Sequence, residues 1–148
     1  MQYLNKTVLL IAIIGLAPLA MAAGDPAEER HERMENVVEE FKSLGGMAKG
    51  ELDFDSLTAM GNLAAMKQQI TGIEALFPEG SYVEGEKRAA KAVWENRADF
   101  DQKMADFGMA IDSAIEANPQ SQAELQPLVQ NLVDSCKGCH EDYRTPGN

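Results

Sequence analysis

The chain has 148 residues, of which 24 are acidic and 13 are basic, so its net charge at pH 7 is −11. This excess of carboxylates argues against nucleic acid as a partner, because affinity for nucleic acid rests on lysine and arginine side chains that neutralise phosphates. A basic protein surface or a small neutral ligand suits such an acidic chain better.

The first 22 residues have the pattern of a secretory signal peptide. One lysine precedes an apolar run over residues 8–20, and the Ala-Met-Ala sequence at 20–22 fits a cleavage site. The run is shorter than the roughly 20 residues that a spanning helix needs, so a membrane anchor is the weaker alternative. We therefore expect cleavage before Ala23 and an exported mature domain of residues 23–148 without a membrane span.

Apolar residues then recur at helical spacing, and no segment alternates as a strand does. The first helix is expected over residues 26–47, ending at the Gly-Gly pair, and the second over residues 56–76 with Asp55 as its N-cap. Their expected apolar positions are Met34, Val37, Phe41 and Leu44 in the first helix, with Ala27 and His31 extending it, and Leu57, Met60, Leu63, Ile70 and Ile73 in the second.

A third helix is expected over residues 86–117 and a fourth from Ser121 to Tyr143. Ser121 and Glu124 form a capping box, although Pro127 leaves open a later start or a kink. The apolar positions are Val93, Phe100, Met104, Phe107, Ile111 and Ala114 in the third helix, and Leu125, Leu128, Leu132 and Cys136 in the fourth. Short links between long helices favour an all-α fold, an antiparallel up-down-up-down four-helix bundle.

The strongest chemical signal is the sequence "CKGCH" at residues 136–140, near the end of the fourth helix. Cys136, Cys139 and His140 lie within about one turn of each other on one helix face. Each thiol can form a thioether with one vinyl group of a haem, and the imidazole can then bind the iron. C-x-x-C-H is therefore typical of covalent c-type haem attachment.

Three alternatives for this motif are weaker. A redox dithiol is usually placed at a helix N-terminus after a strand, where its thiol pKa is lowered. A structural zinc site needs a fourth ligand, and His31 is the only other histidine. A disulfide between two positions three apart on a helix has poor geometry.

The motif near the end of a four-helix bundle resembles the class II c-type cytochromes, the cytochrome c′ family. Further stretches that resemble the family are "GMAKGELDFD", "LFPEGS" and "VWENRADF", and Arg144 four residues after the motif histidine. The likeness covers the mature chain. It implies an iron protein of the bacterial periplasm that holds one covalently attached haem c. It also implies redox partner proteins in the periplasm. Because family members often dimerise, it also implies a homodimer.

The resemblance implies two branches of function, which differ in the sixth iron ligand. In one branch an apolar residue of the first helix covers a five-coordinate iron that binds NO or CO, and Val37 matches that position. In the low-spin branch, similar to cytochrome c-556, a first-helix methionine binds the iron, and Met34 matches that ligand. We expect Met34 as the distal ligand and single-electron transport as the function. His31 is an alternative ligand or a solvated histidine.

Several other residues are expected around the haem. The resemblance implies that Arg144 lies near the proximal face. Arg97 falls in the seam of the third helix, where either a haem propionate or an acidic side chain would neutralise it. Arg33 and Arg30 are further candidates for the propionates. Trp94 and Tyr143 are expected to pack against the haem or in the core. No acid, base or nucleophile is positioned for catalysis, so we do not expect an enzyme.

Overall fold

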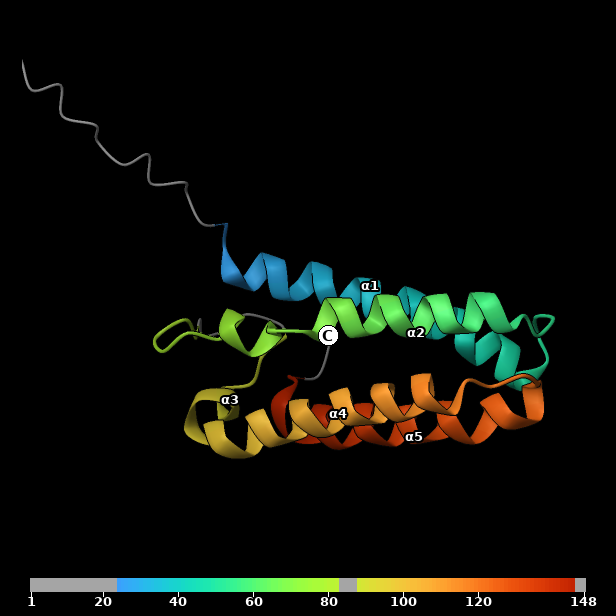
Figure 1. Cartoon of the computed structure of the whole chain (residues 1–148). Helices are drawn as coiled ribbons and strands as arrows, with labels where there is room; N and C mark the ends of the chain where they lie inside the picture. Colours follow the sequence, from blue (N-terminus) through green and yellow to red (C-terminus); the bar gives the residue numbers. More distant parts are fainter. Residues whose placement is uncertain (1–23, 83–87, 146–148) are drawn as a thin grey trace, which may run out of the picture.

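The computed structural model describes residues 24–82 and 88–145, so the expected signal peptide lies outside the described residues. Within these ranges the four-helix bundle is confirmed, and it is accompanied by two short helical turns (Figure 1). The elements are α1 (Pro26–Lys49), α2 (Ser56–Ile70), the 3-10 helix η1 (Ile73–Leu76), α3 (Ala92–Glu95), α4 (Arg97–Ala117) and α5 (Gln122–Tyr143).

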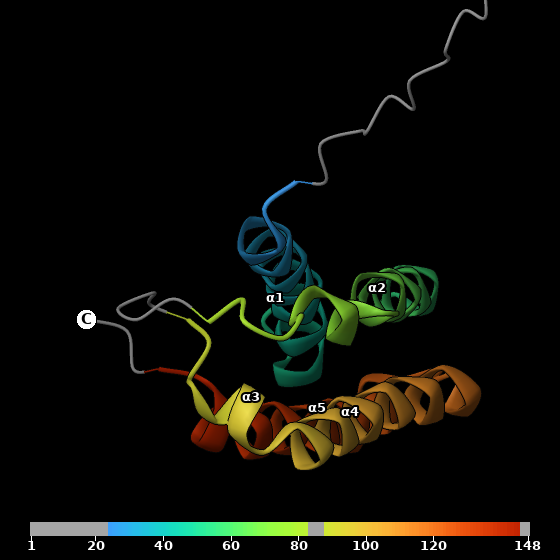
Figure 2. The same cartoon turned by 90° about the vertical axis from the view of Figure 1, so that its left-hand side faces the viewer.

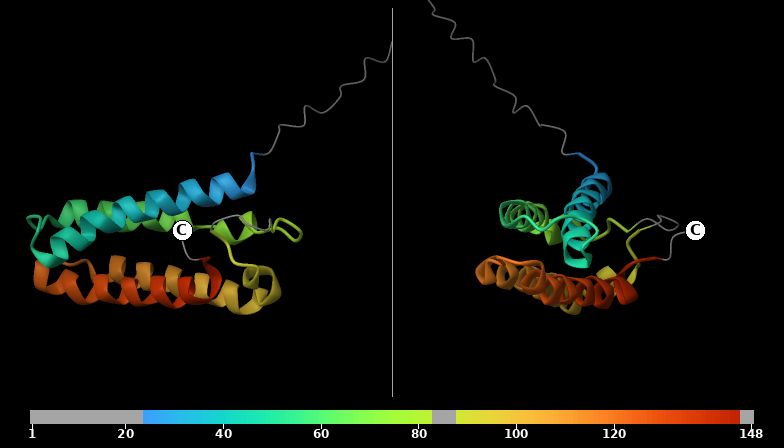
Figure 3. Two further views of the ribbon diagram at one scale, coloured as in Figure 1. Left: turned by 180° about the vertical axis from the view of Figure 1, so that it is seen from behind. Right: turned by 90° about the vertical axis from the view of Figure 1, so that its right-hand side faces the viewer.

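The four long helices form two layers that cover each other, α1 with α2 and α4 with α5, as the end-on view in Figure 2 and the views in Figure 3 also show. α1 packs against α2 and α5, and α4 packs against the same two helices. Successive helices run in opposite directions, so the beginning of α1 and the end of α5 lie at the same end of the bundle. None of the helices in the described residues is long and apolar enough to cross a membrane.

Side-chain caps start the helices where the sequence predicts them. Asp55 accepts a hydrogen bond from the Thr58 backbone N–H at 2.7 Å, and its hydrogen bonds with the Thr58 side chain and backbone lower the pKa of the Asp55 carboxyl. The Ser121 hydroxyl accepts from the Glu124 N–H at 3.3 Å, so α5 begins at Gln122 and not at Pro127. Pro127 lies in the second turn of α5, where its ring removes one intrahelical hydrogen bond.

The prediction that the first helix ends at the Gly-Gly pair is wrong. α1 continues through Gly45 and Gly46 to Lys49. Gly46 is buried beneath Leu52, whose Cδ1 would lie only 2.8 Å from an added Cβ, so the missing side chain serves close packing. The helix ends at Gly50, which adopts the left-handed conformation (φ 75°) that favours glycine at a helix C-terminus.

The second and third helices are shorter than predicted. α2 stops at Ile70 because Gly72 turns the chain with φ 71°, and the remaining expected turn forms η1. The third segment becomes two helices, since Asn96 has non-helical dihedral angles between α3 and α4. Residues 88–91 are not helical, and residues 86–87 lie outside the described ranges.

The prediction that Leu57 belongs to the apolar face is also wrong, because this side chain is 84% exposed. The buried face of α2 consists of Ala59, Leu63, Met66 and Ile70. Leu57 lies two residues before Ala59, which places it on nearly the opposite side of a helix with 3.6 residues per turn.

Most of the other expected apolar positions are buried. These buried residues belong to one hydrophobic core, to which all four long helices contribute. The buried members that the sequence predicted are Val37, Leu44, Leu63, Ile70, Ile73, Val93, Phe100, Met104, Phe107, Ile111, Ala114, Leu125 and Leu132, and those packed partly against them are Met34, Phe41, Met60, Leu128 and Cys136.

Candidate functional site

The CKGCH motif and the first helix line the same cavity. It has a volume of about 210 Å³ and lies where α1, α4 and α5 meet. The residues that line it are Met34, Val37, Val38 and Phe41 of α1, Met104 and Phe107 of α4, and Val133, Ser135, Cys136, Lys137, Cys139 and His140 of α5. The structure thus brings together five of the predicted site residues: Met34, Val37, Cys136, Cys139 and His140.

Helical geometry explains this juxtaposition. The four α1 residues are spaced at intervals of three, one and three, which places them on one stripe of the helix. The antiparallel arrangement then sets the beginning of α1 beside the end of α5, where the motif is found. Val37 is buried, whereas Val38 is 48% exposed and marks the edge of the cavity.

The two thiols are unbonded to each other and lie partly buried at the cavity wall. Burial raises the pKa of Cys136 to about 11, and it also raises the pKa of Cys139, against which the positive charge of Lys103 acts. Both thiols are therefore protonated at neutral pH, unlike the activated thiolate of a redox dithiol. Among the residues that the structure describes, no group of three or more His, Cys, Asp or Glu side chains could hold a metal ion, so the zinc alternative gains no support.

The surroundings of His140 favour its neutral form. Loss of hydration lowers the pKa of its imidazole, and the positive charge of Arg144 lowers it further. A neutral imidazole keeps a free lone pair, which a metal ion requires. Arg144 follows the histidine by one turn, and its backbone N–H donates to the His140 carbonyl at 3.3 Å. The carbonyl of the intervening Tyr143 accepts from the Ala90 N–H at 2.9 Å, which ties the end of α5 to the segment before α3.

Sequence reasoning missed a set of polar contacts from α4 to the motif. The Lys103 ammonium donates to the Gly138 carbonyl and to an Asp142 carboxylate oxygen, both at 2.8 Å. One turn earlier, Asp99 accepts a hydrogen bond of 2.5 Å from the hydroxyl of the buried Tyr143. The available signal was that Asp99 and Lys103 are four residues apart, on a helix whose seam faces α5.

His31 does not line the cavity. One ring nitrogen contacts Glu35 at 3.0 Å, and the other contacts the guanidinium of Arg88. These contacts agree with the interpretation of His31 as a surface histidine within a charged stretch.

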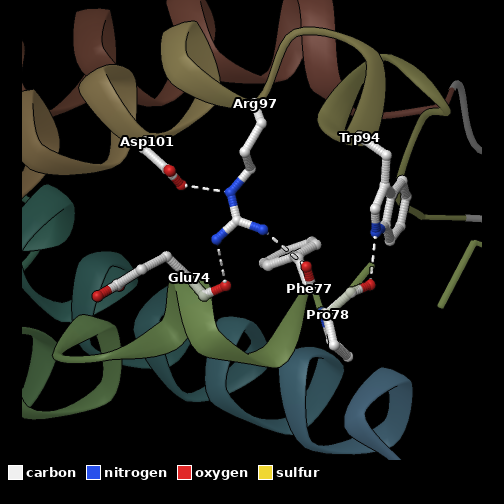
Figure 4. A network of polar contacts seen from close by, with 6 residues as sticks. All are labelled: Glu74, Phe77, Pro78, Trp94, Arg97 and Asp101. Carbon is white, nitrogen blue, oxygen red and sulfur yellow. Dashed lines mark hydrogen bonds and ion pairs between the residues drawn. The ribbon is translucent and has the colours of Figure 1, made fainter. Parts of the chain in front are cut away.

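The three candidate arginines Arg30, Arg33 and Arg97 also do not line the cavity. Instead they bind backbone carbonyls around η1. Arg97 donates to the carbonyls of Phe77 and Glu74 and pairs with Asp101 at 2.7 Å, so an acidic side chain is the neutralising partner observed (Figure 4). Arg33 donates to the Thr71 carbonyl at 3.1 Å.

Arg30 is buried and donates to the Leu76 carbonyl at 2.8 Å, with its guanidinium over the rings of Phe77 and Trp94. Trp94 is partly buried against the core, and its indole N–H donates to the Pro78 carbonyl at 2.9 Å (Figure 4). These contacts give the arginines and the tryptophan a structural role at the η1 corner.

The residues of the cavity fit a haem. The walls on the α1 and α4 sides are apolar, as a macrocycle requires, and Met34 adds a thioether to that surface. The α5 side presents two thiols and one imidazole, the groups that covalent attachment and iron binding would need. Such a donor set, with a soft thioether and an imidazole, is common in cytochromes.

Comparison with known proteins gives the same answer. The family model described as Cytochrome C′ matches residues 25–144. The chain is 36% identical to the cytochrome c-554 of Cereibacter sphaeroides, over 95% of this chain and 94% of that protein. It is 30% identical to the cytochrome c′ of Rhodopseudomonas palustris, with 91% and 94% covered.

The structure of a cytochrome c′ from Rhodopseudomonas palustris superposes with a TM-score of 0.79 at 28% identity, covering 85% of this chain and all of that one. The chain therefore belongs to the cytochrome c′ family, the class II c-type cytochromes, whose members hold a covalently attached haem c.

Proposed function

We propose that this protein carries single electrons in the periplasm, through a haem c held by Cys136 and Cys139, with His140 and Met34 as the two axial iron ligands. Proteins of this family transfer electrons or bind gases. The observation that supports Met34 as the second ligand is that Met34 of α1 and His140 of α5 line one cavity. The sulfur and the imidazole belong to different helices, so a flat macrocycle can be held between them.

The haem, when bound, supplies an iron that changes its charge by one electron. The protein contributes the surroundings. A thioether from Met34 is a soft ligand that favours the reduced iron and so raises the reduction potential. Phe41, Met104 and Phe107 exclude water from the apolar walls, which limits access of small reactants.

Val37 supports the second candidate function, which is gas binding at a five-coordinate iron. Its side chain lines the same cavity from the next turn of α1 and is 5% exposed. If Met34 packs against the core without binding iron, Val37 would cover an open coordination site. The names of the relatives include both a cytochrome c′ and a cytochrome c-554, and they do not decide between these functions.

The deciding experiment is the absorption spectrum of the purified holoprotein, oxidised and reduced, with and without CO. Electron transfer through Met34 predicts a sharp low-spin reduced spectrum, a weak far-red band when oxidised, and no response to CO. A broad high-spin spectrum that shifts at once with CO would contradict it and favour gas binding.

A matched pair of variants separates ligation from packing. Met34→Leu and Met104→Leu each remove a sulfur from the same cavity while nearly conserving volume, so the packing cost of either should be less than about 1.5 kcal/mol. We expect Met34→Leu alone to abolish the far-red band and to allow CO to bind. Identical spectra for the two variants would refute ligation by Met34.

The expected partners are redox proteins with a basic surface, because the chain carries a net charge of −11. Export and a homodimeric state remain part of the proposal. N-terminal sequencing of the mature protein tests the cleavage before Ala23, and its mass in solution tests the homodimer.

A further inference from the structure

We propose that Lys103 is a positioning residue that raises the reduction potential of the haem site, by holding a positive charge against the turn of α5 that carries the haem ligands. The inference rests on the proposed attachment at Cys136 and Cys139 and on His140 as a ligand. It does not depend on which residue, if any, is the sixth ligand.

The Lys103 ammonium is held in place by several contacts with the end of α5. It donates to the Gly138 carbonyl, which directly precedes Cys139 in the chain, and to Asp142 on the next turn. It also lies 5.9 Å from the centre of the Tyr143 ring. The side chain is 28% exposed, so its position is fixed better than that of a freely solvated lysine.

The neighbouring residue Met104 and the nearby Phe107 line the haem cavity. One helix, α4, therefore supplies both a wall of the cavity and the cation that contacts the motif.

The surrounding charges show what Lys103 balances. Asp142 is in direct contact with the ammonium, and Asp99 is bound to Tyr143 one turn along α4. Without Lys103, the three carboxylates of Asp99, Glu141 and Asp142 would outnumber the two cations of the motif segment, Lys137 and Arg144. A partly buried charge interacts more strongly than a solvated one, because water and salt screen it less.

The sign follows from electrostatics. Reduction adds one electron to the haem, so a nearby positive charge favours the reduced form and raises the potential. Removing that charge leaves the carboxylates unbalanced and favours the oxidised form. If Lys103 only connected α4 to α5, its replacement would change the stability of the protein, and the reduction potential would not follow the charge at this position.

The chain contains a matched control in the pair Lys67 and Asp112. Lys67 of α2 contacts Asp112 at 2.6 Å and the Gly108 carbonyl at 3.5 Å, so it makes the same kinds of bond between two helices. Its exposed fraction, 36%, is similar to that of Lys103. However, these contacts join α2 to α4 and do not touch α5.

The test is a spectroelectrochemical titration of the haem-loaded protein and its variants. We expect Lys103→Met to lower the potential clearly more than Lys67→Met, although both change the net charge by the same amount. Lys103→Arg should stay close to the parent. Adding Asp142→Asn to Lys103→Met should bring the potential back toward the parent value, because it restores the charge balance without restoring the contact.

Equal shifts for Lys103→Met and Lys67→Met would overturn the inference, as would a double variant whose potential does not recover. If Lys103→Met does not fold, the carboxylate partners give the same comparison. Asp142→Asn should then raise the potential more than Asp112→Asn, and equal shifts for these two would also refute the role of Lys103.

The outcome is separable from the proposed function. Failure of the parent protein to attach haem at Cys136 and Cys139 would refute the site itself. A haem-loaded parent with equal potentials in the matched variants would refute only the inference about Lys103.

Discussion

The two ends of the bundle differ in how completely they are packed. At the end where α1 finishes and α5 begins, Leu44, Ile111 and Leu125 are fully buried. At the other end, Ile73 and Val93 are also buried, but Met34 and both cysteines are only partly buried, around a cavity. The fully packed end supplies hydrophobic stabilisation, while the cavity end leaves apolar surface that a haem can cover.

This difference indicates that one end of the four helices contributes mainly to stability and the other end to ligand binding. The packed end is also joined by polar contacts across its turns. Ser56 donates to the Pro119 carbonyl at 2.8 Å, and the Gln122 side chain donates to the Ala48 carbonyl at 3.2 Å. We therefore expect substitutions at the two ends to have different consequences, one for stability and the other for the haem.

The largest effect is expected at the cavity end, from replacing both thiols. Cys136→Ser with Cys139→Ser should abolish covalent haem attachment completely, because a hydroxyl does not form the thioether. Haem staining of a denaturing gel measures it. Lys137→Ala, which changes an exposed residue between the two cysteines, is the control and should keep the stain. Covalent haem in the double serine variant would exclude these cysteines as the attachment site.

A large effect on stability is expected at the packed end. Leu125→Ala removes a fully buried side chain and should destabilise the protein by about 2–5 kcal/mol, through lost burial and a cavity. Val38→Ala at the cavity edge should cost roughly 0.5 kcal/mol or less, because it removes a half-exposed side chain. Urea unfolding of the haem-loaded protein compares them. Similar losses would mean that the two ends do not differ in packing as described.

Smaller effects on stability are expected at two glycines that differ in backbone conformation. Gly50→Ala should destabilise by roughly 1 kcal/mol, because φ is 75° there and an added Cβ would approach the Gln122 side chain. Gly61→Ala should stabilise by about 0.5–1 kcal/mol, since Gly61 lies within α2 and nothing crowds an added Cβ. Thermal unfolding should show shifts of opposite sign, and the same sign would contradict the assigned conformation of Gly50.

The smallest effect is a pH dependence at the start of α2. The pKa of Asp55 is lowered in the fold by its hydrogen bonds with Thr58. Its stabilising contribution is therefore present above the ordinary carboxyl pKa and is lost as the pH falls through the lowered value. The unfolding midpoints of Asp55→Ala and the parent should differ at pH 7 and converge in acid. A difference that persists unchanged at low pH would exclude the ionised carboxylate as its cause.

Local patterns predicted most of the helices but not all of their limits. Asp55 and Ser121 are recognisable caps because they satisfy backbone N–H groups within their own turn. The Gly-Gly pair gave the wrong end for α1 because the packing of Leu52 on Gly46 is a contact outside the helix. Leu57 was misplaced for a related reason, since hydrophobicity does not reveal which side of α2 meets the core.

The site was predictable to a similar extent. The CKGCH spacing identifies haem attachment because its geometry is contained in one helical turn, whereas Met34 as a ligand stays a prediction. Arg97 was rightly expected to need a partner, but carbonyls of η1 and Asp101 surround it at a corner away from the cavity. The spacing of Asp99 and Lys103 indicated that both face α5, but the partners of Lys103 could not be predicted, because they are 35 and 39 positions away in the chain.

The sequence by itself determined that this protein is a helical bundle with a haem-attachment motif, since helical periodicity and the CKGCH spacing act over one or two turns. Only the tertiary structure decided that Met34 and Val37 share a cavity with His140, that the arginines hold η1, and that Lys103 supports the motif. The physical reason is range: these contacts join helices far apart in the chain, and their positions follow from how the whole core packs.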